Sequence, residues 1–118
     1  VRPLSPEQAM RYVGAIGSTL QAHAGYDTVL VDGRFRLACL LFSRRFLKRD
    51  GAALVHDFTP RPRGARSDIW RGRFATWSRA LQHYSLAQQN DSLALLTPLH
   101  KTRVTEDELT VALRSADR

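Results

Sequence analysis

The chain has 118 residues, a length that favours one domain with a buried core of its own. Its hydrophobic content of 43% is typical of a folded globular protein, and no apolar run approaches the ~20 residues that cross a bilayer. The single cysteine, Cys39, excludes an internal disulfide and a zinc site built from several cysteines. The formal charge of +7 makes a polyanionic partner a reasonable hypothesis. No signal peptide is visible, so we expect a cytoplasmic protein; because the chain starts with Val1 and not Met, we expect an excerpt or a processed product.

The first half of the chain predicts a strand–helix–strand unit behind an opening helix. A capping box at residues 5–8 predicts the start of that helix, and apolar residues follow at helical spacing. The β-branched, apolar run 28–31 predicts a strand that is buried on both faces, as in parallel sheets. A second helix is predicted over 35–47 and a second strand over 52–56. This succession in so few residues predicts a right-handed βαβ unit.

The second half predicts a hairpin and a terminal helix. An apolar stripe from Trp70 to Tyr84 predicts a third helix. Two strands are predicted over 85–89 and 92–97, with a tight turn between them. A second capping box, Thr105 to Glu108, predicts a short terminal helix that we expect to be loosely held. We therefore divide the chain into an α/β unit over 1–104 and a short terminal helix or tail over 105–118.

Three motifs carry a resemblance to a known family. They are VLVDGRFRLACLL at 29–41, ALVHDF at 53–58 and LALLTP at 93–98. In this order they resemble the second half of class I S-adenosylmethionine-dependent methyltransferases, especially a methyltransferase-like group that carries VDGRFRxAC. The resemblance covers roughly residues 5 to 100. It implies a partial Rossmann-like α/β sheet, with two parallel strands followed by a C-terminal antiparallel hairpin and helices on the faces.

The resemblance also defines what this chain lacks. Such methyltransferases bind their cofactor mainly through a glycine-rich turn after the first strand and an acidic residue after the second. No G-x-G occurs in this chain, and no strand candidate for the first three strands precedes Tyr26. The resemblance therefore implies S-adenosylmethionine as cofactor of a complete form, not of this chain alone. We expect a methyltransferase-like domain that is incomplete or inactive in isolation, and its enzymatic activity stays open.

The same reasoning predicts an unpaired strand edge. If the first three strands are absent, the run 28–31 becomes an exposed apolar edge, and such edges pair with another chain or aggregate. We expect either a homodimer or a missing N-terminal half at this edge.

The candidate site residues follow the two parallel strands. Asp32 and Asp57 end neighbouring strands at the edge where open α/β sheets bind ligands, so they could hold a divalent cation, or one could act as a base. The alternatives are that Asp32 caps the next helix and that Asp57 fixes its loop. His56 is a candidate proton carrier or a hydrogen-bonded strand end. Arg34 is a candidate substrate ligand or a salt-bridge partner of the aspartates.

Arg36 is a further candidate substrate ligand, although its place on the predicted helix also fits a solvated face. The other histidines show no ligand spacing, and we expect His23, His83 and His100 at the surface. A second function stays possible, a non-catalytic basic module that binds nucleic acid or another polyanion. The residues that would form it are Arg61, Arg63, Arg66, Arg71 and Arg73.

Overall fold

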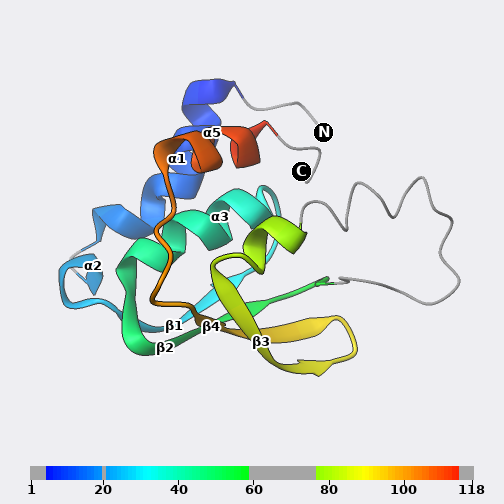
Figure 1. The fold of residues 1–118 in the computed structure, drawn as a ribbon. Coiled ribbons are helices and arrows are strands. Elements are labelled where there is room, and N and C mark those ends of the chain that lie inside the picture. The colour runs from blue at the N-terminus through cyan, green and yellow to red at the C-terminus, as the bar shows by residue number, and fades with distance from the viewer. Residues whose placement is uncertain (1–4, 20, 59–76, 115–118) are drawn as a thin grey trace, which may run out of the picture.

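The described strands form one mixed sheet. The computed structural model describes residues 5–19, 21–58 and 77–114. Strands β1 (Tyr26–Val31), β2 (Leu47–Val55), β3 (Tyr84–Asn90) and β4 (Leu93–Pro98) lie in the order β1-β2-β4-β3. Strands β1 and β2 are parallel, whereas β4 pairs antiparallel with both β2 and β3 (Figure 1). The predicted α/β class, with two parallel strands followed by an antiparallel hairpin, is confirmed.

Three helices lie over one face of this sheet: α1 (Pro6–Gly14), α3 (Arg36–Ser43) and α5 (Glu106–Leu113) (Figure 1). The predicted capping box starts α1, because the Ser5 hydroxyl accepts from the N–H of Gln8 and the Gln8 side chain accepts from the N–H of Ser5. The opening helix is more broken than predicted. It passes into a 3-10 turn, η1 (Ala15–Ser18), and a short helix, α2 (Gln21–Ala24).

The crossover between the parallel strands is also shorter than predicted. Helix α3 ends at Ser43 and a 3-10 turn, η2 (Arg44–Phe46), leads directly into β2. Strand β2 therefore begins before the predicted range 52–56, and its register against β1 shifts between Tyr26 and Thr28. Gly51 lies in this irregular stretch, where an added Cβ would be 3.0 Å from three carbonyl oxygens. The Asp50–Gly51 pair thus marks a bulge within a strand, where glycine permits close backbone approach.

The hairpin is close to its prediction. Strand β3 extends one residue beyond its predicted range at each end, and β4 begins and ends one residue later than predicted. Asp91 takes a left-handed conformation in the turn. Tyr84 was predicted on the third helix and instead begins β3, where it is buried. Within the described residues, that helix occupies 77–80. The rest of its predicted range lies outside the described residues.

The core lies between the sheet and the three helices. Because side chains alternate along a strand, every second residue of β1, β2 and β4 faces the helices. The buried strand residues on this face are Val29, Val31, Ala53, Val55, Ala94 and Leu96. Helix α3 covers them with Leu37, Leu40 and Leu41, each no more than 1% exposed.

The opposite face of the sheet is called here the open face and consists of Thr28, Leu30, Leu54 and Leu95. Leu30 is 66% exposed, Thr28 is exposed, and the paired residues Leu54 and Leu95 are partly buried. The prediction that the run 28–31 is buried on both faces is therefore wrong for the part of the chain that the structure describes. The reason is that α1, α3 and α5 all pack on the other side.

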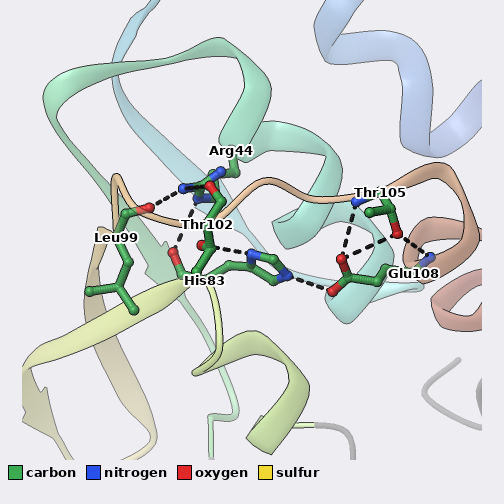
Figure 2. A network of polar contacts seen from close by, with 6 residues as sticks. All are labelled: Arg44, His83, Leu99, Thr102, Thr105 and Glu108. Atoms are coloured by element: carbon green, nitrogen blue, oxygen red, sulfur yellow. Dashed lines mark hydrogen bonds and ion pairs between the residues drawn. The ribbon is translucent and has the colours of Figure 1, made fainter.

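Helix α5 is joined to the sheet by a polar network around His83 (Figure 2). His83 Nδ1 lies 2.9 Å from Thr102 Oγ1, and Nε2 lies 2.5 Å from Glu108 Oε2. The Arg44 guanidinium donates to the carbonyl oxygens of His83, Leu99 and Thr102. His83 is only 4% exposed, so the expectation that it lies at the surface is wrong.

Packing also holds α5 in place. Its second capping box is present, with the Thr105 side chain accepting from the N–H of Glu108. Leu109 and Ala112 are 2% and 1% exposed. The predicted terminal helix is thus confirmed, but it is anchored to the core and is not loosely held.

Candidate functional site

The carboxyl ends of β1 and β2 lie side by side. Val31 pairs with Val55, and the N–H of His56 donates to the Val31 carbonyl at 3.1 Å. Asp32 follows β1 directly, while His56 and Asp57 follow β2. Because the strands are parallel, all three side chains meet at one edge of the sheet, which is where open α/β sheets place their ligands. The sequence predicted this meeting.

The edge cluster consists of Asp32, Arg36, His56 and Asp57. His56 Nδ1 lies 3.5 Å from Asp32 Oδ1 and 3.3 Å from Asp57 Oδ2. The side chains of Asp32, His56 and Asp57 are about half exposed, so a ligand in solution reaches them. Ligand atoms of these three residues lie within 4.8 Å of one another, close enough to contact one bound group together.

Arg36 joins the two carboxylates from the first turn of α3. Its Nη2 donates to Asp57 Oδ2 at 3.2 Å and lies 3.9 Å from Asp32 Oδ1. A cation at a helix N-terminus opposes the helix dipole, and the two carboxylates offset that cost. The side chain is only 20% exposed, so Arg36 is not on a solvated helix face. The salt bridge to the aspartates that the sequence predicts for Arg34 is made by Arg36. The Arg34 guanidinium lies over the Phe35 ring.

Two loops at this edge contain left-handed backbone. Phe35 has φ 56° and Asp57 has φ 58°, and bulky residues rarely adopt this conformation. This conformation costs a bulky residue such as Phe35 about 1–3 kcal/mol, whereas aspartate adopts it more readily. Phe35 is compensated by burial, since it is 4% exposed. The packing that imposes this conformation on Phe35 fixes the start of α3 beside the edge cluster.

The alternative in which Asp32 caps the next helix is not observed. The N-cap residue of α3 is Phe35, which makes no side-chain cap. Asp32 Oδ1 instead accepts from the N–H of Gly33 at 2.9 Å. The Asp32 side chain is therefore held beside His56 and Arg36 and is not used to start the helix.

The sequence missed two residues beside the edge cluster. Gln89 Nε2 donates to the Phe58 carbonyl at 2.7 Å and so joins the end of β3 to the loop after β2. Tyr12, on α1, packs its ring 6.0 Å from that of Phe35. Both contacts join segments far apart in the chain, and no local pattern in the sequence signals them.

The chemistry available at the edge cluster is proton exchange and polar binding. Carboxylates and imidazole both accept or donate protons to a bound group in hydrogen-bond reach. Asp32, His56 and Asp57 also lie close enough together to bind one cation in common. Arg36 already places a positive charge against both carboxylates, so a metal ion would compete with that guanidinium.

Within the described residues, the loop after β1 does not offer the open glycine-rich backbone that the resemblance associates with S-adenosylmethionine. No G-x-G turn occurs in the chain. The one glycine in the loop after β1, Gly33, has φ 93°, and the Tyr12 hydroxyl lies 3.1 Å from where its Cβ would be. Backbone at this glycine is therefore covered by a side chain and is not open to a ligand.

The basic module could not be placed. Arg61, Arg63, Arg66, Arg71 and Arg73 lie outside the described residues. In the stretches that the structure describes, no helix has the length and apolar character needed to traverse a membrane.

Fold and site together define an α/β module with a polar cluster at the carboxyl edge of two parallel strands. The chain matches no family model, and no curated protein matches it in sequence. Among solved structures it is similar to a methyltransferase-like protein from Silicibacter pomeroyi, with a TM-score of 0.62 and 20% sequence identity. The match covers 97% of this chain and 54% of that protein, so this chain spans about half its length. The likeness establishes a methyltransferase-like fold.

Proposed function

We propose that this chain supplies the acceptor-binding half of a methyltransferase-type domain. The observation that carries the proposal is the edge cluster, which sits at the ligand-binding edge of a fold shared with a methyltransferase-like protein. The resemblance of the motifs at 29–41, 53–58 and 93–98 supports the same assignment. The chain is proposed to contribute positioning and proton exchange, which are the contributions that its own residues can make.

In this proposal the methyl acceptor is a hydroxyl or amine that enters the edge cluster. Asp32 and Asp57 accept its hydrogen bonds, and His56, within 3.5 Å of both carboxylates, takes up its proton. Arg36 is a positioning residue, because its largely buried guanidinium donates to Asp57 Oδ2 and so orients that carboxylate. Arg34, on the same loop, is proposed to contact a polar group of the acceptor.

The cofactor is proposed to bind elsewhere. S-adenosylmethionine, which supplies the methyl group in such enzymes, would be held by the half of the domain that this chain lacks. The first test is a calorimetric titration of the cofactor into the isolated chain. We expect no saturable heat, and clear stoichiometric binding would show that the division into two halves is wrong.

The second test addresses the edge cluster. In a complete form of the domain, transfer of labelled methyl groups to a panel of small amines and alcohols is measured for Asp57→Asn, His56→Gln and a control, Asp50→Asn. Asp50 is exposed in the first half of β2, away from the carboxyl end of the strand where the edge cluster lies. We expect the two site variants to lose about 10²-fold in kcat and the control to lose nothing. Equal activity in all three would exclude the edge cluster from catalysis.

A further inference from the structure

We propose that Tyr12 forms one wall of the acceptor site, so that the acceptor carries its hydroxyl or amine on an aromatic ring. The inference deepens the proposed function and rests on it for the statement that a methyl acceptor binds at the edge cluster. Its own evidence is the position, exposure and packing of the Tyr12 ring, which is not a member of the edge cluster.

Tyr12 reaches the rim of the edge cluster from helix α1. Its hydroxyl lies 3.1 Å from the point where a Cβ on Gly33 would stand. Gly33 is also the residue that holds Asp32, since its N–H donates to Asp32 Oδ1 at 2.9 Å. The phenol of Tyr12 and the carboxylate of Asp32 are therefore both adjacent to Gly33. A molecule that binds to Asp32 is within reach of the Tyr12 side chain.

Much of the Tyr12 side chain is in contact with solvent. Tyr12 is 45% exposed, whereas Ala9 and Val13 on the same helix are 6% and 2% exposed. Ligand sites ordinarily combine apolar or aromatic walls with a few polar groups that fix the orientation of the ligand. At the carboxyl edge of β1 and β2 the edge cluster supplies the polar groups, and Tyr12 supplies an aromatic surface beside them.

The position of the Tyr12 ring is held by Phe35. The two ring centroids are 6.0 Å apart at an interplanar angle of 57°, a tilted arrangement that aromatic pairs favour. Phe35 is only 4% exposed, so this support belongs to the core. A wall that is already held in place loses little conformational freedom when a ligand packs against it.

An aromatic ring is the acceptor framework that best matches such a wall. A ring that packs against Tyr12 gains an offset or edge-to-face contact in addition to the burial of apolar area, which corresponds to about twofold to tenfold in affinity. A saturated ring of the same size gains the apolar area alone. With the ring against Tyr12, an attached hydroxyl or amine can enter the edge cluster beside Asp32.

Two probes distinguish recognition of an aromatic ring from burial of apolar area. Benzylamine and cyclohexylmethylamine carry the same amine and the same number of carbon atoms, and the saturated ring is at least as apolar. Their dissociation constants for this chain are measured by NMR titration, in which the amide signals of Asp32, Gly33 and Asp57 are followed. We expect both probes to shift these signals and benzylamine to bind about threefold to tenfold more tightly.

Three variants assign the preference to a residue. Tyr12→Phe keeps the ring and should keep the preference. Tyr12→Leu keeps an apolar cover over Phe35 and should remove the difference between the two probes. Val111→Ala is the control, because Val111 is 44% exposed on α5, and it should leave the preference unchanged. Thermal melts show whether each variant folds, and the comparison of the two probes on the native chain does not depend on any variant.

Three results would overturn the inference. The first is equal affinity of the two probes for the native chain, and the second is a preference that Tyr12→Leu retains. Either result would mean that Tyr12 only covers Phe35 and does not recognise a ring. The third is a set of signal changes that leaves Asp32, Gly33 and Asp57 unaffected, since the probes would then bind at another place.

The inference and the proposed function fail separately. A chain that prefers benzylamine through Tyr12, within a complete form that transfers no methyl group, would keep the aromatic site and remove the proposed function. A complete form that methylates cyclohexylmethylamine as efficiently as benzylamine would keep the proposed function and remove the aromatic site.

Discussion

The hydrogen bond between His83 and Glu108 gives the sharpest test of how the C-terminal helix is held. Replacing Glu108 by Gln removes the negative charge and keeps a side chain that can complete the capping box with Thr105 and accept from His83. Glu106→Gln is the matched control, because Glu106 is in the same helical turn, pairs with Arg45 and has a 77% exposed side chain. The comparison separates a buried, charge-assisted contact from a surface one.

The expected magnitude follows from the environment of each pair. His83 is 4% exposed and its Nε2 lies 2.5 Å from the Glu108 carboxylate. Charge-assisted hydrogen bonds are about twice as strong as neutral ones, so Glu108→Gln should lower the free energy of unfolding by about 1 kcal/mol. In a domain of this size such a loss corresponds to a drop of about 4 °C in Tm. Glu106→Gln should cost less than about 0.5 kcal/mol, as exposed pairs do.

The pH dependence supplies the sign of the effect. The hydrogen bond from His83 lowers the pKa of Glu108 below its ordinary 4.5, and bonds from Thr105 add to this against the opposing effect of burial. A carboxyl whose folded-state pKa is lowered contributes stability above its unfolded-state pKa, and this is lost as the pH falls through the folded-state value. The difference between native protein and Glu108→Gln should therefore be full at about pH 7 and shrink at about pH 3.

The assay is urea unfolding followed by tryptophan fluorescence, since Trp77 is buried beside Phe58. Unfolding curves of the native protein and the two variants, recorded at both pH values, give the differences in the free energy of unfolding. The reasoning is refuted if Glu108→Gln costs no more than Glu106→Gln near neutral pH. It is also refuted if the gap to the native protein widens in acid.

Two further predictions concern buried backbone contacts. Tyr84→Phe should cost about 1 kcal/mol, because the hydroxyl donates to the Leu40 carbonyl at 2.7 Å inside the core. Burial raises the pKa of Tyr84, so the native protein should lose stability as the pH rises above the ordinary value of 10 and the Phe variant should lose less, as alkaline urea titrations would show. Gly51→Ala should destabilise by about 1–3 kcal/mol, since its Cβ would press on three carbonyl oxygens. Gly14→Ala at the end of α1 meets nothing within 4 Å and should be neutral or stabilising by up to about 1 kcal/mol; a thermal melt in which Gly51→Ala matches it would contradict the close approach at Gly51.

The edge cluster shows how far site prediction from sequence extends. Asp32, His56 and Asp57 could be brought together from sequence because parallel strands that end at the same edge place their following residues side by side. The partner of the two aspartates could not be assigned. Arg34 and Arg36 both follow Asp32, and the left-handed turn at Phe35 directs Arg36 between the carboxylates. In that turn the Phe35 ring is buried and packs against Tyr12, which is distant in the sequence. No local sequence pattern therefore predicts the turn.

His83 illustrates the opposite limit. A lone histidine without ligand spacing is ordinarily exposed, and no pattern around His83 predicts its burial. The chain after β4 returns across the sheet and places Thr102 and Glu108 against the two ring nitrogens, while Arg44 binds the backbone around them. The burial of His83 is possible because these partners satisfy it, and they come from three separate segments.

The sequence by itself determined the elements whose signals are local. These are the two capping boxes, the apolar strand that precedes Asp32, the carboxyl end of the strand that precedes His56 and Asp57, and the hairpin, whose hydrogen bonds form between neighbours in the chain. Only the tertiary structure decided which face of the sheet is covered, which arginine joins the aspartates, and how α5 is anchored. Those outcomes depend on contacts between segments that are distant in sequence. A local pattern of residues does not specify which distant segments come into contact.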